Sequence, residues 1–325
     1  MLDIVITHYR EPWEVCRKQF LMLDLQRRVD WSEVRVTVIN DGGHRLPAEK
    51  LAELSYEVHQ VDIPHGGISA ARNAGIELLD GEWLMFCDCD DCFSNIYALE
   101  DVVNVLHGDA AQKYDIMWTK CYEEDSVGGR IFLIPQHKTF VFCHGKIYRR
   151  QFLLDEGIRF PQELKMNEDS CFNAIIIART TNERVGEIRS HVPVYTWIRR
   201  DGSVTNSDYA KDLGAECQNR RNMIVTEENR LHRPQEYPGM VTRSAYDVFY
   251  MCHGNRISQS CKQRILAAFV PWFRERLEIF GTVDEETLEK IRAISKFELL
   301  DHGEEVQDDH ETVRKWVLLM TGVES

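Results

Sequence analysis

Three carboxylates follow a short apolar stretch, and their residue types and spacing suit the binding of a divalent cation. Residues 83–87 are apolar and of strand type, and Asp88, Asp90 and Asp91 come directly after them. A buried strand that ends in this way presents acidic groups at the carboxyl edge of a sheet, where open α/β sheets bind their ligands. Clustered carboxylates suit Mg²⁺ or Mn²⁺, ions that commonly carry a diphosphate. A solvated acidic turn is the alternative interpretation of this stretch by itself.

A glycine pair upstream of the carboxylates is suited to phosphate binding. Gly66 and Gly67 stand immediately before a helix that the sequence predicts over 68–79. Glycines let the backbone approach a ligand closely, and the start of a helix presents free amides to an anion. Arg72 lies about one turn inside this helix and could hold a phosphate or a base edge. Taken alone, the pair is equally consistent with a tight turn.

Strands and helices must position these residues, and the N-terminal part of the sequence alternates between them. The predicted strands cover 2–7, 34–39, 56–63 and 83–88, and the predicted helices cover 12–28 and 68–79. This alternation is typical of a mostly parallel sheet flanked by helices, so the predicted fold class is α/β.

The rest of the chain is predicted to become helical towards its end. Helices are predicted over 95–106, 146–157 and 168–178, strands over 116–121, 130–134 and 192–198, and a hairpin turn across 125–129. From about residue 209 only helix-like segments remain; one of them, 265–280, is expected to break or kink at Pro271. The acidic tail 301–311 is predicted to be a solvated surface.

Composition restricts the class of protein and its compartment. A formal net charge of -14 argues against a generic nucleic-acid binder. The ten cysteines lack framework spacing, which predicts free thiols in a reducing cytoplasm; the pair Cys89 and Cys92 has no partners for a zinc site. No apolar run approaches the roughly 20 residues of a membrane span, and the N-terminus lacks the features of a signal peptide. We therefore expect a cytoplasmic protein.

Taken in order, these motifs resemble the inverting glycosyltransferases of family 2, which have the GT-A fold. The first part of the resemblance covers about residues 2–93 and rests on Thr7-x-Tyr9, Asn40-Asp41-Gly42, Gly67-x-Ser69-x-Ala71-Arg72-Asn73-x-Gly75 and Asp88-x-Asp90-Asp91. It resumes, to about residue 206, at His144-Gly145-Lys146-Ile147-Tyr148-Arg149-Arg150, Gly157-Ile158-Arg159-Phe160, Glu168-Asp169-x-x-Phe172 and Arg200-x-Gly202-Ser203-Val204-Thr205. The resemblance implies a GT-A catalytic domain over 1–206. A helical region over 207–325 would bind the acceptor, mediate oligomerisation or pack against the domain.

The resemblance implies roles for residues that bind the nucleotide sugar. Thr7 and Tyr9 would line the nucleobase pocket, with Tyr9 against a uracil face. Asp41 would accept a hydrogen bond from the base imide, which favours a UDP-sugar donor. Gly67 would let the backbone approach the ligand, and Arg72 would lie near the base and the phosphates.

The resemblance also implies a metal site and a general base. Asp90 would bind Mn²⁺ or Mg²⁺ bridging the diphosphate, Asp88 would reach the ribose or a metal-bound water, and Asp91 would support them. The family places its base in the pair Glu168 and Asp169. We expect Asp169 to be the base and Glu168 to be a substrate contact or the substitute base; a helix N-terminal cap is the alternative role for the pair.

The segment 199–206 matches a family segment that can fold over the diphosphate, so that Arg200 and Ser203 would contact phosphate; a plain polar turn is the alternative. The sequence departs from the family at several positions. Thr7 stands where many members have proline, Asn40 where the first of two aspartates is usual, and His144-Gly145 where Trp-Asn is more common. The last departure weakens inferences about the acceptor side.

We therefore expect a metal-dependent, inverting transferase that moves a hexose or hexosamine from a nucleotide sugar to a hydroxyl acceptor. The acceptor could be a glycan, a lipid-linked saccharide, a protein or a modified nucleobase, and the helical region could form a homo-oligomer. A sugar nucleotidyltransferase is one alternative, but residues 8–11 lack its glycine-rich pattern. A catalytically silent nucleotide-sugar-binding or scaffold protein of the same fold is another; the presence of Asp90 and Asp169 argues against it.

Overall fold

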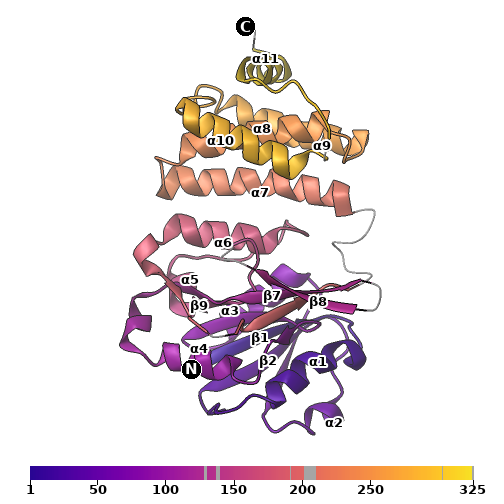
Figure 1. Ribbon diagram of the computed structural model, residues 1–325, viewed down its shortest axis with the longest axis vertical. Helices are drawn as coiled ribbons and strands as arrows, with labels where there is room; N and C mark the ends of the chain where they lie inside the picture. The colour runs from indigo at the N-terminus through magenta and orange to yellow at the C-terminus, as the bar shows by residue number, and fades with distance from the viewer. Residues whose placement is uncertain (128–129, 137–139, 191, 201–209, 302, 324–325) are drawn as a thin grey trace. The chain divides into compact units, whose positions relative to one another are not determined.

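The computed structural model describes residues 1–127, 130–136, 140–190, 192–200, 210–301 and 303–323. The chain divides into two compact units (Figure 1). The first unit comprises 1–163 and 168–203, and the second comprises 164–167 and 204–325. The domain boundary predicted at residue 206 falls outside the described residues and stays a prediction.

The first unit is built around a seven-stranded sheet with the order β10-β6-β9-β4-β1-β2-β3. Four of its strands are parallel neighbours: β1 (Leu2–His8), β2 (Val34–Asp41), β3 (Val58–Ile63) and β4 (Trp83–Asp88). Thr7 near the end of β1 lies opposite Asp88 at the end of β4. Because parallel strands end at the same edge, this register brings residues 81 positions apart in the sequence together.

The remaining strands extend the sheet beyond β4. β9 (Lys146–Arg149) lies antiparallel between β4 and β6 (Ile116–Trp118), and β10 (Val185–Glu187) pairs parallel to β6. The sheet is therefore mixed, but its larger part is parallel, as the sequence predicts.

Helices cover both faces of this sheet. The helices of the unit are α1 (Trp13–Asp24), α2 (Ala48–Leu51), α3 (Ile68–Leu78), α4 (Ala98–Leu106), α5 (Arg150–Asp155) and α6 (Glu168–Arg179), with short 3₁₀ turns at Asp109–Lys113 and Asn182–Arg184. On one face, α1 and α4 share a core with alternate residues of β1, β2 and β4. On the opposite face, Phe86 of β4 meets Phe172 of α6 edge to face. Gly75 lets α3 approach β1, since a Cβ there would lie 2.6 Å from Val5.

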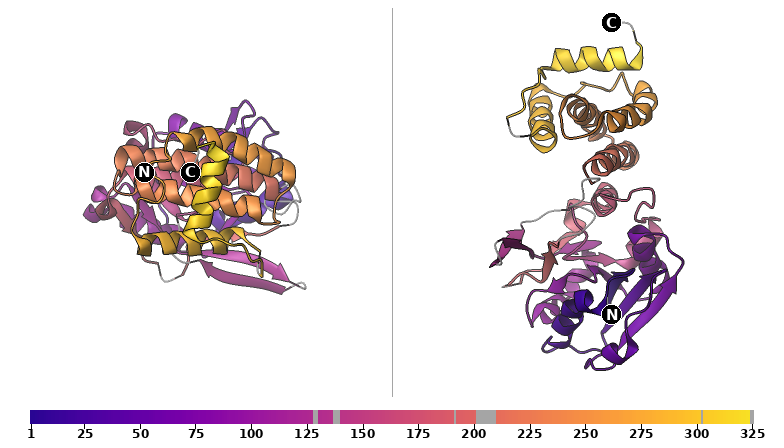
Figure 2. Two further views of the ribbon diagram at one scale, coloured as in Figure 1. Left: turned by 90° about the horizontal axis from the view of Figure 1, so that it is seen from above. Right: turned by 90° about the vertical axis from the view of Figure 1, so that its right-hand side faces the viewer.

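A second, four-stranded sheet lies in the same unit, with the order β5-β11-β7-β8. Its strands are β5 (Cys92–Phe93), β11 (Tyr195–Ile198), β7 (Cys121–Val127) and β8 (Arg130–Gln136). β7 and β8 pair antiparallel, and Figure 2 shows them reaching away from the larger sheet.

The second unit is helical where the structure describes it. It contains α7 (Ala210–His232), α8 (Tyr237–His253), α9 (Gln259–Arg274), α10 (Glu285–Leu299) and α11 (His310–Thr321), drawn in orange to yellow in Figures 1 and 2. Side chains of α9, α10 and α11 join those of α8 in one apolar core. Ser258, Asp284 and Asp309 cap α9, α10 and α11, each accepting a bond from the amide three residues on. Of the helices described, none is long and apolar enough to cross a membrane.

Three local predictions differ from the structure. The predicted helix over 146–157 is wrong at its start, because Lys146–Arg149 is strand β9 and only Arg150–Asp155 is helical. The predicted strand 116–121 ends at Trp118, and the hairpin instead joins Cys121–Val127 to Arg130–Gln136. Pro271 lies inside α9 and does not break it, since the helix continues to Arg274, and the alternative of a kink stays a prediction. All ten cysteines are free thiols, as predicted.

Candidate active site

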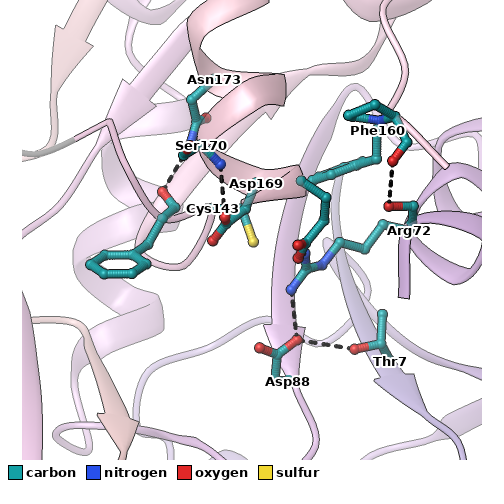
Figure 3. A network of polar contacts seen from close by, with 12 residues as sticks. Thr7, Arg72, Asp88, Cys143, Phe160, Asp169, Ser170 and Asn173 are labelled. Carbon is teal, nitrogen blue, oxygen red and sulfur yellow. Dashed lines mark hydrogen bonds and ion pairs between the residues drawn. The ribbon is translucent and has the colours of Figure 1, made fainter. Parts of the chain in front are cut away.

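The end of β4 and the start of α6 are joined by a chain of polar contacts (Figure 3). The Thr7 hydroxyl donates a hydrogen bond of 3.1 Å to Asp88 Oδ1. Arg72 Nη2 donates to the same oxygen at 3.0 Å, and Arg72 Nη1 donates to Glu168 Oε1 at 2.8 Å. Four residues that the sequence analysis singled out therefore form one connected network, although they lie on β1, α3, β4 and α6.

Arg72 is the centre of this network and is almost fully buried, with 2% of its surface exposed. A buried guanidinium needs carboxylate partners, and Asp88 and Glu168 supply them. Its third nitrogen, Nε, is buried without a hydrogen-bond partner among the residues described. Burial opposes the charge of Asp88, but Arg72 and the Thr7 hydroxyl hold the pKa of this carboxyl below its ordinary value. Asp88 is therefore ionised in the folded protein.

Asp91 anchors the turn that follows β4. Its carboxylate accepts hydrogen bonds from the Tyr195 hydroxyl at 3.0 Å and from the Ile198 amide at 2.9 Å. The Tyr195 oxygen also accepts a bond of 3.1 Å from the Asp88 amide. Asp91 is 1% exposed and so has a supporting position behind the other two aspartates. No local pattern in the sequence points to Tyr195, because its partners lie more than a hundred residues upstream.

Asp90 is partly exposed and forms an ion pair with Arg200, which also lies 3.9 Å from Glu11. Burial and the neighbouring charge of Asp88 raise the pKa of Asp90. A carboxylate whose charge is disfavoured by a neighbouring carboxylate fits a site for a cation. No group of three or more metal-binding side chains exists in the part of the chain that the structure describes. Mg²⁺ commonly takes one or two carboxylates and completes its shell with water and substrate phosphates, so Asp88 and Asp90 fit this ion.

The glycine pair before α3 is folded around Asp41. Asp41 Oδ1 accepts the Gly66 amide at 2.7 Å, and Oδ2 accepts the Gly67 amide at 2.8 Å and meets His65 Nδ1 at 2.8 Å. Gly67 has φ +87°, a conformation that favours glycine. Tyr9 lies nearby with its ring stacked on His65, the centroids being 4.3 Å apart. The expected contacts of Asp41 and Tyr9 with a nucleobase stay predictions; Asp41 Oδ1 accepts only the Gly66 amide among these contacts and has a second lone pair that could accept another bond.

Asp169 and Glu168 occupy the first turn of α6, as predicted. Asp169 Oδ1 accepts a hydrogen bond of 2.7 Å from the Ser170 amide. Burial first, and the adjacent Glu168 charge second, raise the pKa of Asp169 to about 7. A carboxyl that titrates near neutrality is suited to accept a proton as a general base. Glu168 is held in its ion pair with Arg72, and this favours Asp169 as the general base.

Two residues of the predicted site remain to be placed. Arg200 is described, and it pairs with Asp90 rather than standing free. Ser203, with most of the predicted segment 199–206, lies outside the described residues. His144 is buried, and burial, helped by Lys146, lowers its pKa to about 3, so its ring is neutral. The sequence analysis assigned no task to His144 or Lys146.

Comparison with known proteins identifies the same N-terminal region. Residues 3–162 match the sequence model of the family described as Glycosyl transferase family 2. The poly(ribitol-phosphate) beta-N-acetylglucosaminyltransferase TarS of Staphylococcus aureus is 26% identical over 170 residues, which are 48% of this chain and 28% of TarS. YibD of Escherichia coli, named as an uncharacterized glycosyltransferase, is 24% identical over 266 residues, 73% of this chain and 76% of YibD. The chain thus spans less than a third of TarS and about three quarters of YibD.

Solved structures show the same fold. Residues 1–349 of Staphylococcus aureus TarS, crystallised with UDP-GlcNAc, match with a TM-score of 0.62 at 18% identity, over 94% of each chain. The mannosyltransferase PcManGT of Pyrobaculum calidifontis, in complex with GDP-Man and Mn²⁺, matches with a TM-score of 0.51 at 11% identity, over 99% of this chain and 84% of that one. These matches confirm the predicted α/β fold of the GT-A type.

Proposed function

We infer that the protein transfers a hexose or hexosamine from a nucleotide sugar to a hydroxyl acceptor with inversion. The inference starts from residues 3–162, which belong to glycosyltransferase family 2. The observation that carries this proposal is the contact chain from Thr7 through Asp88 and Arg72 to Glu168. It links the end of the strand where a nucleotide diphosphate would bind to the helix that bears Asp169. Donor-binding groups and a candidate base therefore belong to one rigid network.

We propose that Asp169 removes the proton of the acceptor hydroxyl. In an inverting transfer the acceptor attacks the sugar from the face opposite the leaving group, so a base must stand on that side. The raised pKa of Asp169, about 7, makes the carboxylate a stronger base than an exposed aspartate while leaving much of it ionised at neutral pH. Arg72 and the Ser170 amide hold the pair Glu168 and Asp169 in place.

Asp88 and Asp90 would hold a divalent ion, which when bound neutralises the charge of the departing nucleoside diphosphate. Two further groups on this chain would assist the leaving diphosphate. Arg72 has an Nε donor that is buried without a partner among the described residues, and Arg200 pairs with Asp90. The ion pair of Arg200 with Asp90 is the arrangement of the protein alone. In the donor complex Arg200 would exchange this ion pair for a contact with a phosphate oxygen.

The donor is proposed from the relatives. TarS is named as an N-acetylglucosaminyltransferase and was crystallised with UDP-GlcNAc. PcManGT was crystallised with GDP-Man and Mn²⁺. We therefore propose a UDP-linked hexosamine first and Mn²⁺ or Mg²⁺ as the ion. His65 stacks on the ring of Tyr9 and contacts Asp41 Oδ2, and this shared neighbour supports the proposal that Asp41 and Tyr9 act together on a uracil.

For the acceptor, the name of TarS points to a hydroxyl of a polyol phosphate, and a glycan or lipid-linked saccharide remains the broader class. The helical unit is proposed to contribute to acceptor binding. A homo-oligomer through its helices is an alternative use of the same surface.

Release of free nucleoside diphosphate from a panel of sugar nucleotides, with and without Mn²⁺, tests the proposal without a known acceptor. UDP-GlcNAc, UDP-Glc, UDP-Gal and GDP-Man form the panel. We expect release from one donor that depends on the ion and falls at least about a hundredfold in Asp90→Asn, a change of about 3 kcal/mol in activation free energy. Asp109→Asn, an exposed aspartate of the same unit, is the matched control and should behave as wild type.

Failure to release nucleotide from any donor would not by itself separate the enzyme from a silent binding protein, so binding is measured alongside. Nucleoside diphosphate with Mn²⁺ should raise the melting temperature of the wild type and not of Asp90→Asn. Binding without turnover would favour the silent nucleotide-sugar-binding protein. Absence of both would refute the assignment.

A further inference from the structure

Lys146 is a buried cation that the proposed mechanism does not use. It is the first residue of β9, opposite Trp118 of β6, and its neighbour Ile147 lies opposite Met85 of β4. Because β9 runs antiparallel to β4, this register places Lys146 at the sheet edge where β4 ends in Asp88. Only 3% of Lys146 is exposed.

The ammonium of Lys146 has few hydrogen-bond and ion-pair partners among the described residues. It can donate three hydrogen bonds. Its only hydrogen bond to the described residues is a long one of 3.4 Å to the His144 carbonyl, and its only aromatic contact there is the Phe140 ring at 5.8 Å. No carboxylate of the described residues lies within ion-pair distance of it. Arg72, the other buried cation of this region, has two carboxylates.

The groups around Lys146 do not replace a counterion. Burial raises the pKa of the Cys121 thiol to about 11 and that of Cys143 further, so both thiols are neutral. His144 is neutral as well, because burial lowers its pKa to about 3. Asp169 acts on Lys146 only from beyond ion-pair distance, and with a pKa of about 7 it is ionised only in part at neutral pH. A buried ammonium without a paired anion is costly, and burial accordingly lowers the pKa of Lys146.

We propose that Lys146 binds an oxyanion of the substrate, a phosphate or a carboxylate group. The proposal deepens the proposed function and rests on it for the identity of the site. The oxyanion could come from either of two sources. One is the diphosphate of the donor; the other is an anionic group that the acceptor carries close to its reacting hydroxyl. Both would give the ammonium the charged partner that the protein does not supply.

Thermal unfolding and titration calorimetry with phosphate, pyrophosphate and UDP test this binding. The variant is Lys146→Met, which keeps the length and the apolar stem of the side chain. Since it removes an unpaired buried charge, its melting temperature without ligand should equal or exceed that of the wild type. We expect phosphate or pyrophosphate to stabilise the wild type and to bind at least about tenfold more weakly to Lys146→Met, the effect of losing a charge-assisted hydrogen bond.

UDP distinguishes the two sources. An affinity for UDP that falls about tenfold in Lys146→Met assigns the oxyanion to the donor diphosphate. An unchanged affinity for UDP, with loss of phosphate binding, assigns it to the acceptor. Lys146→Arg keeps the charge and should retain part of the affinity, and Lys113→Met, an exposed lysine of the same unit, should match the wild type.

If phosphate, pyrophosphate and UDP bind Lys146→Met and the wild type equally, or if none of them binds the wild type, the proposal is overturned. Should Lys146→Met fail to fold, Lys146→Gln carries the same comparison. These are binding measurements without turnover. A protein that binds phosphate through Lys146 but neither binds nucleoside diphosphate nor releases it from any donor would overturn the proposed function and leave this inference standing.

Discussion

Replacing Glu168 with glutamine should move the pH dependence of glycosyl transfer to lower pH. Burial and then the charge of Glu168 raise the pKa of Asp169 to about 7. Glu168→Gln removes that charge and keeps an amide oxygen that can still accept the 2.8 Å bond from Arg72. Without the negative charge of Glu168 to oppose it, the positive charge of Arg72 stabilises the ionised form of Asp169 more strongly. Both changes lower the pKa of Asp169.

The size of the effect follows from the behaviour of a general base, which acts only when deprotonated. With a pKa of about 7 for Asp169, the wild-type rate at pH 6 should be about a tenth of its plateau, and it should fall tenfold for each further pH unit. If the inflection moves down by about one pH unit, the relative rate at pH 6 rises about fivefold.

The assay is nucleoside diphosphate release at saturating donor and ion between about pH 5 and 9. Glu156→Gln, an exposed glutamate at the end of α5, is the matched control and should leave the inflection in place. Asp169→Asn should abolish the pH-dependent rate. The reasoning is refuted if the inflection of Glu168→Gln stays near 7 or rises, and Asp169 is not the base if the wild-type rate is flat across this range.

Three further predictions concern the rigidity and the charge of the site. Tyr195→Phe should cost about 1–3 kcal/mol in free energy of unfolding by urea, because a buried oxygen of Asp91 and the Asp88 amide each lose a hydrogen-bond partner. Arg72→Met should cost about 3 kcal/mol in the same measurement, since Asp88 and Glu168 lose their cation. Removal of divalent ions with EDTA should weaken nucleoside diphosphate binding at least about tenfold by calorimetry, because neighbouring carboxylates repel a diphosphate.

Controls for these predictions come from exposed residues of the same types. Tyr97→Phe and Arg28→Met alter a tyrosine and an arginine on the surface of the same unit and should change stability by less than about 0.5 kcal/mol. If Tyr195→Phe or Arg72→Met is no less stable than its control, the corresponding contacts do not hold the site together. Equal nucleotide affinity before and after EDTA would contradict a site built for a cation.

The sequence predicts well those parts of the fold whose pattern is local. The parallel strands β1 to β4 are continuous apolar runs closed by polar turns, so their type and order follow from periodicity. β9 was missed because residues 146–149 are short and flanked by residues that favour a helix. Its strand conformation comes from pairing with β4 and β6, which periodicity does not reveal.

The candidate site likewise contains residues that the sequence predicts and residues that it does not. Asp88, Asp90 and Asp169 could be singled out because carboxylates after a strand or at the start of a helix have a chemical meaning in the sequence itself. The partners that hold them could not. The contact of Arg72 with Glu168 spans 96 positions, and that of Tyr195 with Asp91 spans 104. Such pairs depend on which strands become neighbours in space.

The long separation between Asp91 and its partners also sets the order in which the site is completed during synthesis. Tyr195 and Ile198 leave the ribosome more than a hundred residues after Asp91, and after α6 with its candidate base. A nascent chain that stops before β11 has all three aspartates but not the hydroxyl and amide that fix the third. Because domains fold as units while they emerge, the acidic turn reaches its final geometry only when the end of the first unit has been made. An unfinished chain therefore lacks the contacts that hold the turn carrying the proposed cation ligands.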